Sequence, residues 1–250
     1  MNLSNKKHYK LTTPSKMNIK KEIILLILIV SFVSVTFSQT NNNSFSAWFS
    51  AELNYKLNKK WTFSIQEQLR LKEDASVTDS YFTQLGAEYA LTKRIDVAVN
   101  YRYIKKNDNK GDVQGYNSFG RLQFDLVYGH KIDDFLFKHR FRYQTKNQLG
   151  ISDNANNQIR FKTSVGYNIK RWKLDPKFSA EIFNRMGADN ASKNGLNKYR
   201  LTLGTSYNTK NIGRFGLFYR IEKEINKTFP ETERILGLRY SYTIKKKKRN

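Results

Sequence analysis

Apolar and polar residues alternate along much of this chain, and this alternation limits the folds that are open to it. In the stretch RIDVAVNYRYIKK, residues 94–106, five successive positions of one parity are apolar or aromatic: Ile95, Val97, Val99, Tyr101 and Tyr103. Successive side chains of a β-strand point to opposite faces, so this stretch predicts a strand with one apolar and one polar face. Such a strand fits either a soluble β-sandwich or a barrel that has lipid outside and water inside.

The same period recurs in about eleven segments. They cover residues 45–57, 61–71, 80–91, 95–105, 118–129, 135–145, 157–169, 172–184, 197–208, 214–225 and 232–244. Strands of soluble proteins typically have about 5–6 residues, whereas a tilted membrane strand needs about 9–11. The segments therefore predict an all-β fold, an antiparallel transmembrane β-barrel of about 10–12 strands. Bacterial barrels have an even number of strands, so we expect ten or twelve.

The connections between these segments alternate in length. Short turns such as LNKKW (57–61) and LTKRI (91–95) are separated by longer polar segments such as KNDNKGDVQGYN (106–117). Outer-membrane barrels have short periplasmic turns on one side and longer loops on the other. The sequence contains no amphipathic helix that could cover eleven apolar faces. We therefore expect lipid to cover them.

Residues 17–40 have the layout of a secretory signal peptide. A basic start at Lys20 and Lys21 precedes an apolar run at 23–35, and residues 36–38 (TFS) offer small side chains before a cleavage point. The run is too short to span a bilayer, which favours a cleaved signal over the alternative of an N-terminal anchor.

These features predict how the chain is divided. Residues 1–38 are expected to be a leader and signal peptide that is removed, with either Met1 or Met17 as the start. The remaining ranges are a short N-terminal segment, an outer-membrane barrel and a basic periplasmic tail: 39–44, 45–244 and 245–250. The predicted location is the outer membrane of a Gram-negative bacterium.

Aromatic residues gather toward the ends of the predicted strands. The candidates for two girdles are Trp61 and Trp172 beside short turns and Tyr103, Tyr143 and Tyr199 beside the longer loops. Aromatic side chains favour both interfaces of a membrane, which would explain this placement. The alternative is the general preference of aromatic residues for strands.

One stretch carries a family resemblance. Directly after the turn LNKK, the chain follows the pattern W-x-F/L-x-I-x-x-Q-x-R with Trp61, Phe63, Ile65, Gln68 and Arg70. The pattern resembles an uncharacterised family of Bacteroidetes-type outer-membrane barrels, catalogued as domain of unknown function 2490. The resemblance covers roughly residues 45–244 and implies an outer-membrane location with no established activity.

The final predicted strand is similar to the C-terminal signal that the barrel-assembly machinery reads. Gly237 is followed by Tyr240 and Tyr242 at the expected spacing, and the chain then continues into KKKKRN. The resemblance implies that this machinery is a partner during insertion. The other partners predicted from the barrel are outer-membrane lipid and lipopolysaccharide.

Composition limits the chemistry of the chain. Lys and Arg number 45 against 21 Asp and Glu, a net charge of +24, and there is no cysteine. Disulfides, cysteine metal sites and thiol nucleophiles are therefore excluded. The sequence contains no phosphate-binding glycine loop and no cluster of metal-ligating residues, so we predict no catalytic, cofactor-binding or metal site and no cofactor. Export would place KKKKR (245–249) in the periplasm, so no nucleic-acid partner is predicted.

The polar parity of the strands is rich in cations. The candidates for lining the lumen are Arg102, Arg121, Lys138, Arg140, Arg142, Arg160, Lys162, Arg200, Arg220 and Arg239. A cationic lining lowers the barrier to anions and raises it to cations. This favours a narrow, anion-preferring pore for small acidic solutes. The alternative is that arginines and carboxylates pair and simply fill a small interior.

Two other functions are alternatives to the pore. The first is a surface structural or binding protein whose loops engage a partner. The second is an outer-membrane hydrolase acting on lipid or lipopolysaccharide, for which His139 is the candidate base, although no serine shares a neighbouring position on its face. His139 and Glu67 both fall on the apolar parity of their strands, where a bulge, an interface or another protein would have to accommodate them.

Overall fold

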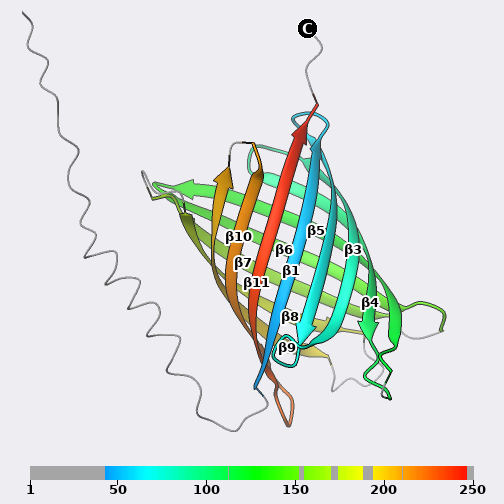
Figure 1. The fold of residues 1–250 in the computed structure, drawn as a ribbon. Helices are drawn as coiled ribbons and strands as arrows, with labels where there is room; N and C mark the ends of the chain where they lie inside the picture. The colour runs from blue at the N-terminus through cyan, green and yellow to red at the C-terminus, as the bar shows by residue number, and fades with distance from the viewer. Residues whose placement is uncertain are drawn as a thin grey trace, which may run out of the picture. The chain divides into compact units, whose positions relative to one another are not determined.

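The computed structural model describes residues 43–111, 113–151, 155–169, 174–187, 194–209 and 211–246. They form eleven β-strands that close into one barrel (Figure 1). The strands are β1 (Asn43–Lys56), β2 (Trp61–Lys72), β3 (Val77–Ala90), β4 (Ile95–Asn107), β5 (Tyr116–Ile132), β6 (Phe135–Gln148), β7 (Asn156–Tyr167), β8 (Leu174–Met186), β9 (Gly195–Thr209), β10 (Gly213–Glu224) and β11 (Thr232–Lys245). The prediction of an all-β barrel is confirmed.

Some predictions concern residues outside these ranges. The predicted signal peptide at 1–38 and residues 247–250 of the predicted tail are not among the described residues. The division of the chain into a removed leader, a barrel and a tail therefore stays a prediction. In the described ranges no helix is long and apolar enough to cross a membrane.

The barrel closes through a parallel pair of strands. Ten neighbouring pairs are antiparallel, whereas β1 and β11 run in the same direction and pair along all of β1, from Asn43 opposite Thr232 to Lys56 opposite Lys245. Figure 1 shows these two strands side by side, pointing the same way. The expectation of ten or twelve strands is wrong, because it assumed that every pair is antiparallel. With eleven strands the first and the last necessarily share a direction.

The two ends of the barrel differ in their connections. At the end where β1 stops, the connections have 2–6 residues: 57–60, 91–94, 133–134, 168–173 and 210–212. We name this the turn end. At the opposite end, the loop end, they have 4–8 residues: 73–76, 108–115, 149–155, 187–194 and 225–231. Both β1 and β11 begin at the loop end, as their parallel pairing requires.

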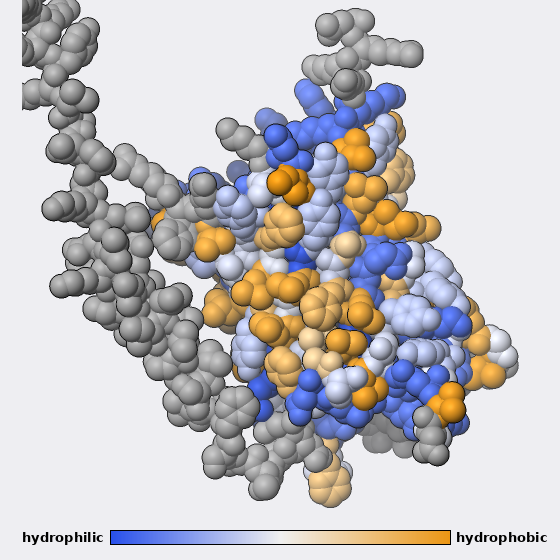
Figure 2. Space-filling view, in the orientation of Figure 1, coloured by the Kyte–Doolittle hydropathy of each residue, from blue (hydrophilic) through white to orange (hydrophobic). Residues whose placement is uncertain are grey.

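The alternation in sequence becomes an alternation between the outside and the inside of the barrel. In β4, Val99 and Tyr101 are exposed on the outer face, while Asn100 and Arg102 are buried inside. Large exposed hydrophobic side chains occur on every strand. Figure 2 shows them gathered over the visible outer face, with hydrophilic residues toward both ends.

The apolar core is small and lies inside the barrel, toward the loop end. It consists of Trp48, Phe82, Ile104, Phe183 and Ile235. Each of these residues lies within six positions of the loop end of its strand. Most of the other inward side chains are polar, so the side chains inside the barrel are held mainly by hydrogen bonds, ion pairs and stacking on aromatic rings.

The two polar residues on the apolar parity do face outward. Glu67 is exposed on β2, and its carboxylate accepts a hydrogen bond from the Thr83 hydroxyl at 3.0 Å. His139 Nδ1 lies 3.1 Å from the Thr163 hydroxyl. No bulge moves either residue, because the register shifts of the described strands lie elsewhere, at 70/71 and 183/184.

Candidate functional site

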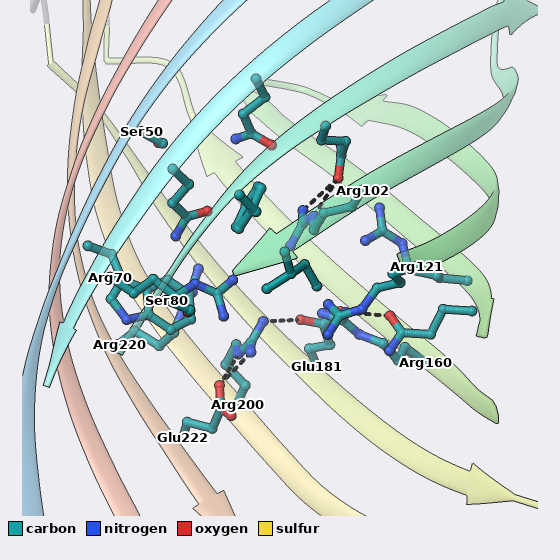
Figure 3. A pocket seen from close by; sticks show the side chains of 18 of the residues that line it. Ser50, Arg70, Ser80, Arg102, Arg121, Arg160, Glu181, Arg200, Arg220 and Glu222 are labelled. Carbon is teal, nitrogen blue, oxygen red and sulfur yellow. Dashed lines mark hydrogen bonds and ion pairs between the residues drawn. The ribbon is translucent and has the colours of Figure 1, made fainter. Parts of the chain in front are cut away.

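A polar cavity of about 470 Å³ lies inside the barrel, and part of it is drawn in Figure 3. Four carboxylates line it: Glu52, Asp79, Glu181 and Glu222. Thirteen cationic side chains line it: Arg70, Arg102, Lys106, Arg121, Arg140, Arg142, Lys146, Arg160, Lys162, Lys198, Arg200, Arg220 and Arg239. The cavity is therefore strongly electropositive.

Nine of the ten residues predicted to line the lumen contribute to this cavity. They are Arg102, Arg121, Arg140, Arg142, Arg160, Lys162, Arg200, Arg220 and Arg239. The tenth, Lys138, lies on β6 opposite Gly129 and Ser164, closer to the turn end. The period of the strands brings these side chains together, because every second residue of a strand faces the same side.

Glu181 is the centre of a compensated ion network. Its carboxylate is only 3% exposed and receives Arg140 at 2.6 Å, Arg160 at 2.8 Å and Arg200 at 3.2 Å. These partners come from three strands, β6, β7 and β9, around Glu181 on β8. One carboxylate thus holds three guanidinium groups at fixed positions on one wall of the cavity.

Two further carboxylates compensate the neighbouring cations. Glu222 binds Lys198 at 2.5 Å and forms an ion pair with Arg200, which therefore bridges Glu181 and Glu222. On the other side of Glu181, Asp125 accepts two hydrogen bonds, one from Arg142 Nε and one from Arg142 Nη2, each at 2.5 Å. This bidentate geometry is the strongest arrangement of a guanidinium and a carboxylate.

A second group of cations has no such compensation. Arg102 on β4 lies directly opposite Arg121 on β5, and Arg121 lies directly opposite Lys146 on β6. We name these three residues the cationic row. None of them makes an ion pair within the described residues. The buried Nε of Arg121 has no hydrogen-bond partner in the same ranges.

Aromatic rings support the cations that lack carboxylates. The guanidinium carbon of Arg102 lies 3.6 Å from the ring centre of Phe82, and that of Arg70 lies 3.9 Å from the ring centre of Trp48. Lys146 Nζ lies 3.8 Å from the ring centre of Phe119. Each ring offers its electron-rich face to the cation, which gives about 0.5–2 kcal/mol of attraction in such positions.

A smaller cavity of about 170 Å³ lies on the turn side of the first. Five cations line it and no described carboxylate does: Lys162, Lys177, Arg214, Arg220 and Arg239. The two cavities share four wall residues, namely Lys162, Phe218, Arg220 and Arg239. These four residues form the boundary between the two cavities.

Four of the five predicted girdle residues are described, and they lie on the outer face. Trp61 is exposed at the turn end, where its ring packs against Tyr89, and Tyr103 is exposed toward the loop end. Tyr143 and Tyr199 are half-buried near the loop end. Trp172 lies outside the described residues.

The geometry around His139 gives no support for nucleophilic catalysis. Its described hydrogen-bond partner is Thr163, and rings of Tyr128, His130 and Phe161 stack around it on the outer face. Ser164 points inward and donates to the carbonyl of Lys138. In the part of the chain that the structure describes, no three His, Cys, Asp or Glu side chains are grouped as metal ligands.

Sequence reasoning missed several residues of the site. Lys146 was expected to lie in a loop, because the strand was predicted to stop at residue 145, whereas β6 continues to Gln148. Trp48 and Phe82 were overlooked because apolar side chains were assigned to the outer face. Both residues lie on the inward parity, and this parity is the signal that would have identified them.

A family model described as "Protein of unknown function (DUF2490)" matches residues 45–231. No curated protein matches the chain. Among solved structures, the NanC porin in a rhombohedral crystal form is similar, with a TM-score of 0.45 and 12% sequence identity, over 71% of this chain and 86% of that one.

Proposed function

Because the chain belongs to the DUF2490 family of proteins of unknown function, we propose a function from the geometry of its barrel alone. The protein is a barrel of the outer membrane, and its interior is a narrow passage that prefers small anions over cations. Acidic solutes of low molecular weight are its cargo, and it carries out no catalysis.

The outer face supports the membrane setting. Its hydrophobic side chains are exposed on all eleven strands, for example Leu85, Leu203 and Leu238, each of which is more than half exposed. A soluble monomer rarely exposes contiguous apolar patches larger than a few hundred Å². Lipid and lipopolysaccharide would cover this surface, and the predicted signal peptide and barrel-assembly machinery would deliver the chain to them.

The single observation that carries the proposal is the charge along the interior. Among the described residues, cations outnumber carboxylates by thirteen to four in the wall of the larger cavity, and the charged residues that line the smaller one are all cations. Inside a barrel with low-dielectric walls, such an excess attracts anions and repels cations.

Pairing between arginines and carboxylates does not account for the interior. Glu181 and Glu222 compensate four cations in one connected network, and Asp125 compensates a fifth, Arg142, in a separate pair. The other eight cations of the larger cavity have no ion pair among the described residues: Arg70, Arg102, Lys106, Arg121, Lys146, Lys162, Arg220 and Arg239. If the inward side chains served only to stabilise the barrel, this excess of unpaired cations would not be expected, because buried unpaired charge is destabilising.

Reconstitution into planar lipid bilayers tests the proposal. With a gradient of potassium chloride, we expect single-channel openings whose reversal potential has the sign of chloride preference. Heat-modifiable gel mobility of the same preparation establishes that the barrel is folded. Preference for potassium would contradict the proposal. A folded barrel without openings would contradict it too, and would favour the alternative of a surface structural or binding protein.

A further inference from the structure

We propose that the cationic row of Arg102, Arg121 and Lys146 is a binding site for a polyvalent anion, of the class of phosphate and sulfate groups. The inference rests on the proposed anion passage, because the solute must reach the interior of the barrel. It goes further in naming one place in the passage where an anion is held and the charge that the anion must carry.

The register of the strands makes the row unusual. Its three members lie directly opposite one another on three adjacent strands, and all three line the larger cavity (Figure 3 labels Arg102 and Arg121). Like charges placed directly opposite on neighbouring strands repel one another and destabilise the sheet. The fold therefore maintains an arrangement that is unfavourable in the absence of a counter-charge.

The immediate surroundings of the row supply no counter-charge. On the inward face, its neighbours along the strands and at the two ends of the row are uncharged: Gln84, Asn100, Ile104, Phe119, Gln123, Gln144, Gln148 and Asn156. Asp79 also lines the cavity, but it accepts a hydrogen bond from Ser80 and makes no ion pair with the row among the described contacts. By contrast, Arg200 lies directly between Glu181 and Glu222.

The guanidinium groups of the cationic row can donate hydrogen bonds to a ligand in the cavity. Gln84 Oε1 accepts from Arg102 Nε at 2.9 Å and from Nη2 at 2.6 Å, while the ring of Phe82 lies against the same guanidinium. Arg102 is thereby fixed in orientation. Arg121 makes no described hydrogen bond through its side chain, and its Nε is buried. An anion in the cavity would accept hydrogen bonds from the guanidinium N–H groups that these contacts leave free, without displacing a carboxylate.

The donor set indicates the charge of the ligand. Guanidinium groups present planar forks that match the oxygens of phosphate, sulfate or carboxylate, and an ammonium adds a point charge. Three neighbouring cations favour a compact group with at least two negative charges over a monovalent ion. The cavity of about 470 Å³ has the size of an ordinary small-molecule site.

Calorimetric titration of the folded barrel in detergent, at low ionic strength and pH 8, tests the site with inorganic phosphate. We expect one saturable site for phosphate, weakened at least tenfold by Arg121→Gln. Arg214→Gln is the matched control, because it removes one arginine charge from the wall of the smaller cavity, away from the row. Its effect should be less than twofold. Equal weakening by both variants, or no binding to the native protein, would overturn the proposal.

A second measurement separates a ligand site from a structural role. Removing a like charge from the row relieves repulsion, so Arg121→Gln should raise the urea midpoint of unfolding while it lowers phosphate affinity. A lowered midpoint would show that Arg121 supports the fold and would overturn the site. Reversal potentials of the same preparations keep the two proposals distinct. Chloride preference without phosphate binding refutes the site alone, and phosphate binding without conductance refutes the passage alone.

Discussion

The ring of Phe218 lies against the backbone of Gly237, its direct partner across the β10–β11 ladder. A Cβ atom at position 237 would overlap the ring, and on the other flank a Cβ at Gly204 would come within 2.9 Å of Phe218 Cβ. The guanidinium carbons of Arg220 and Arg239 lie 4.6 and 5.6 Å from the centre of the same ring. Glycine on both sides therefore lets an inward aromatic ring lie flat on the wall, at the boundary between the two cavities.

The first prediction follows from this contact. Gly237→Ala should move the ring of Phe218 off the wall and into the boundary that both cavities share. Single-channel conductance in planar bilayers should therefore fall by at least half relative to the native barrel. The double variant Gly237→Ala/Phe218→Ala should recover it, because the displaced ring is then absent.

Gly166→Ala is the control for this prediction. Gly166 also lies on the inward parity, but a Cβ there would meet only carbonyl oxygens of Pro176 and Leu136, at 3.9 and 4.0 Å. The single-channel conductance of the Gly166→Ala variant should equal that of the native barrel. A fall of the same size in both glycine variants would show that the effect is general to the wall and has nothing to do with Phe218.

The second prediction concerns Glu181, which compensates three arginines. Glu181→Gln leaves Arg140, Arg160 and part of the charge of Arg200 without a partner inside the barrel. Breaking a buried pair by removing one member typically destabilises a protein by about 3–5 kcal/mol. We expect a loss of this order in the free energy of unfolding, measured by urea titration of the barrel in lipid vesicles.

Glu52→Gln provides the comparison. Glu52 lines the same cavity but forms no ion pair within the described residues. The loss of its charge should change the free energy of unfolding by less than about 1 kcal/mol, as for other weakly interacting charges. If the two variants unfold at the same urea concentration, the network around Glu181 does not stabilise the barrel.

The third prediction tests what covers the outer face. Leu85 lies near the middle of β3 and is 57% exposed, whereas Leu91 is equally exposed, at 56%, just beyond the turn end of the same strand. An arginine facing lipid at the bilayer midplane destabilises a barrel by about 2–4 kcal/mol, and one near the interface by about 0–1 kcal/mol. Leu85→Arg should thus lower the free energy of unfolding, measured by urea titration in lipid vesicles, by more than Leu91→Arg does. Equal costs would mean that lipid does not cover the middle of the barrel.

The fourth prediction tests the parallel closure. Asn54 of β1 and Thr243 of β11 are direct register partners. A short thiol crosslinker should join them in the variant Asn54→Cys/Thr243→Cys, and the circularised chain should migrate differently on a denaturing gel even after boiling. The pair Asn54→Cys/Lys138→Cys should not react, because β6 lies five strands away from β1. A barrel that closes in another way would leave Asn54→Cys and Thr243→Cys unlinked.

Counting along the chain was enough to assign side chains to the outer or the inner face of the barrel. Strand side chains alternate with a period of two, so the outward positions of Val99 and Tyr101, and even the exceptional outward position of Glu67, follow from counting along the chain. The same pattern marked eleven strand segments, but the expectation of ten or twelve strands, which assumed that every pair is antiparallel, was wrong. The exact end of β6 did not, because polar residues such as Lys146 continue a strand into a loop without a change of pattern.

Which inward charges meet could not be read from the sequence and depends on how the strands pair in three dimensions. Arg102 and Arg200 have equivalent positions in the alternation, yet Arg200 is placed between two carboxylates and Arg102 beside another arginine. The difference arises from the registers of β4 with β5, of β8 with β9 and of β9 with β10. The period of two within a strand excludes shifts of register by one residue, because they would turn the apolar face inward, but it does not choose among shifts by two residues.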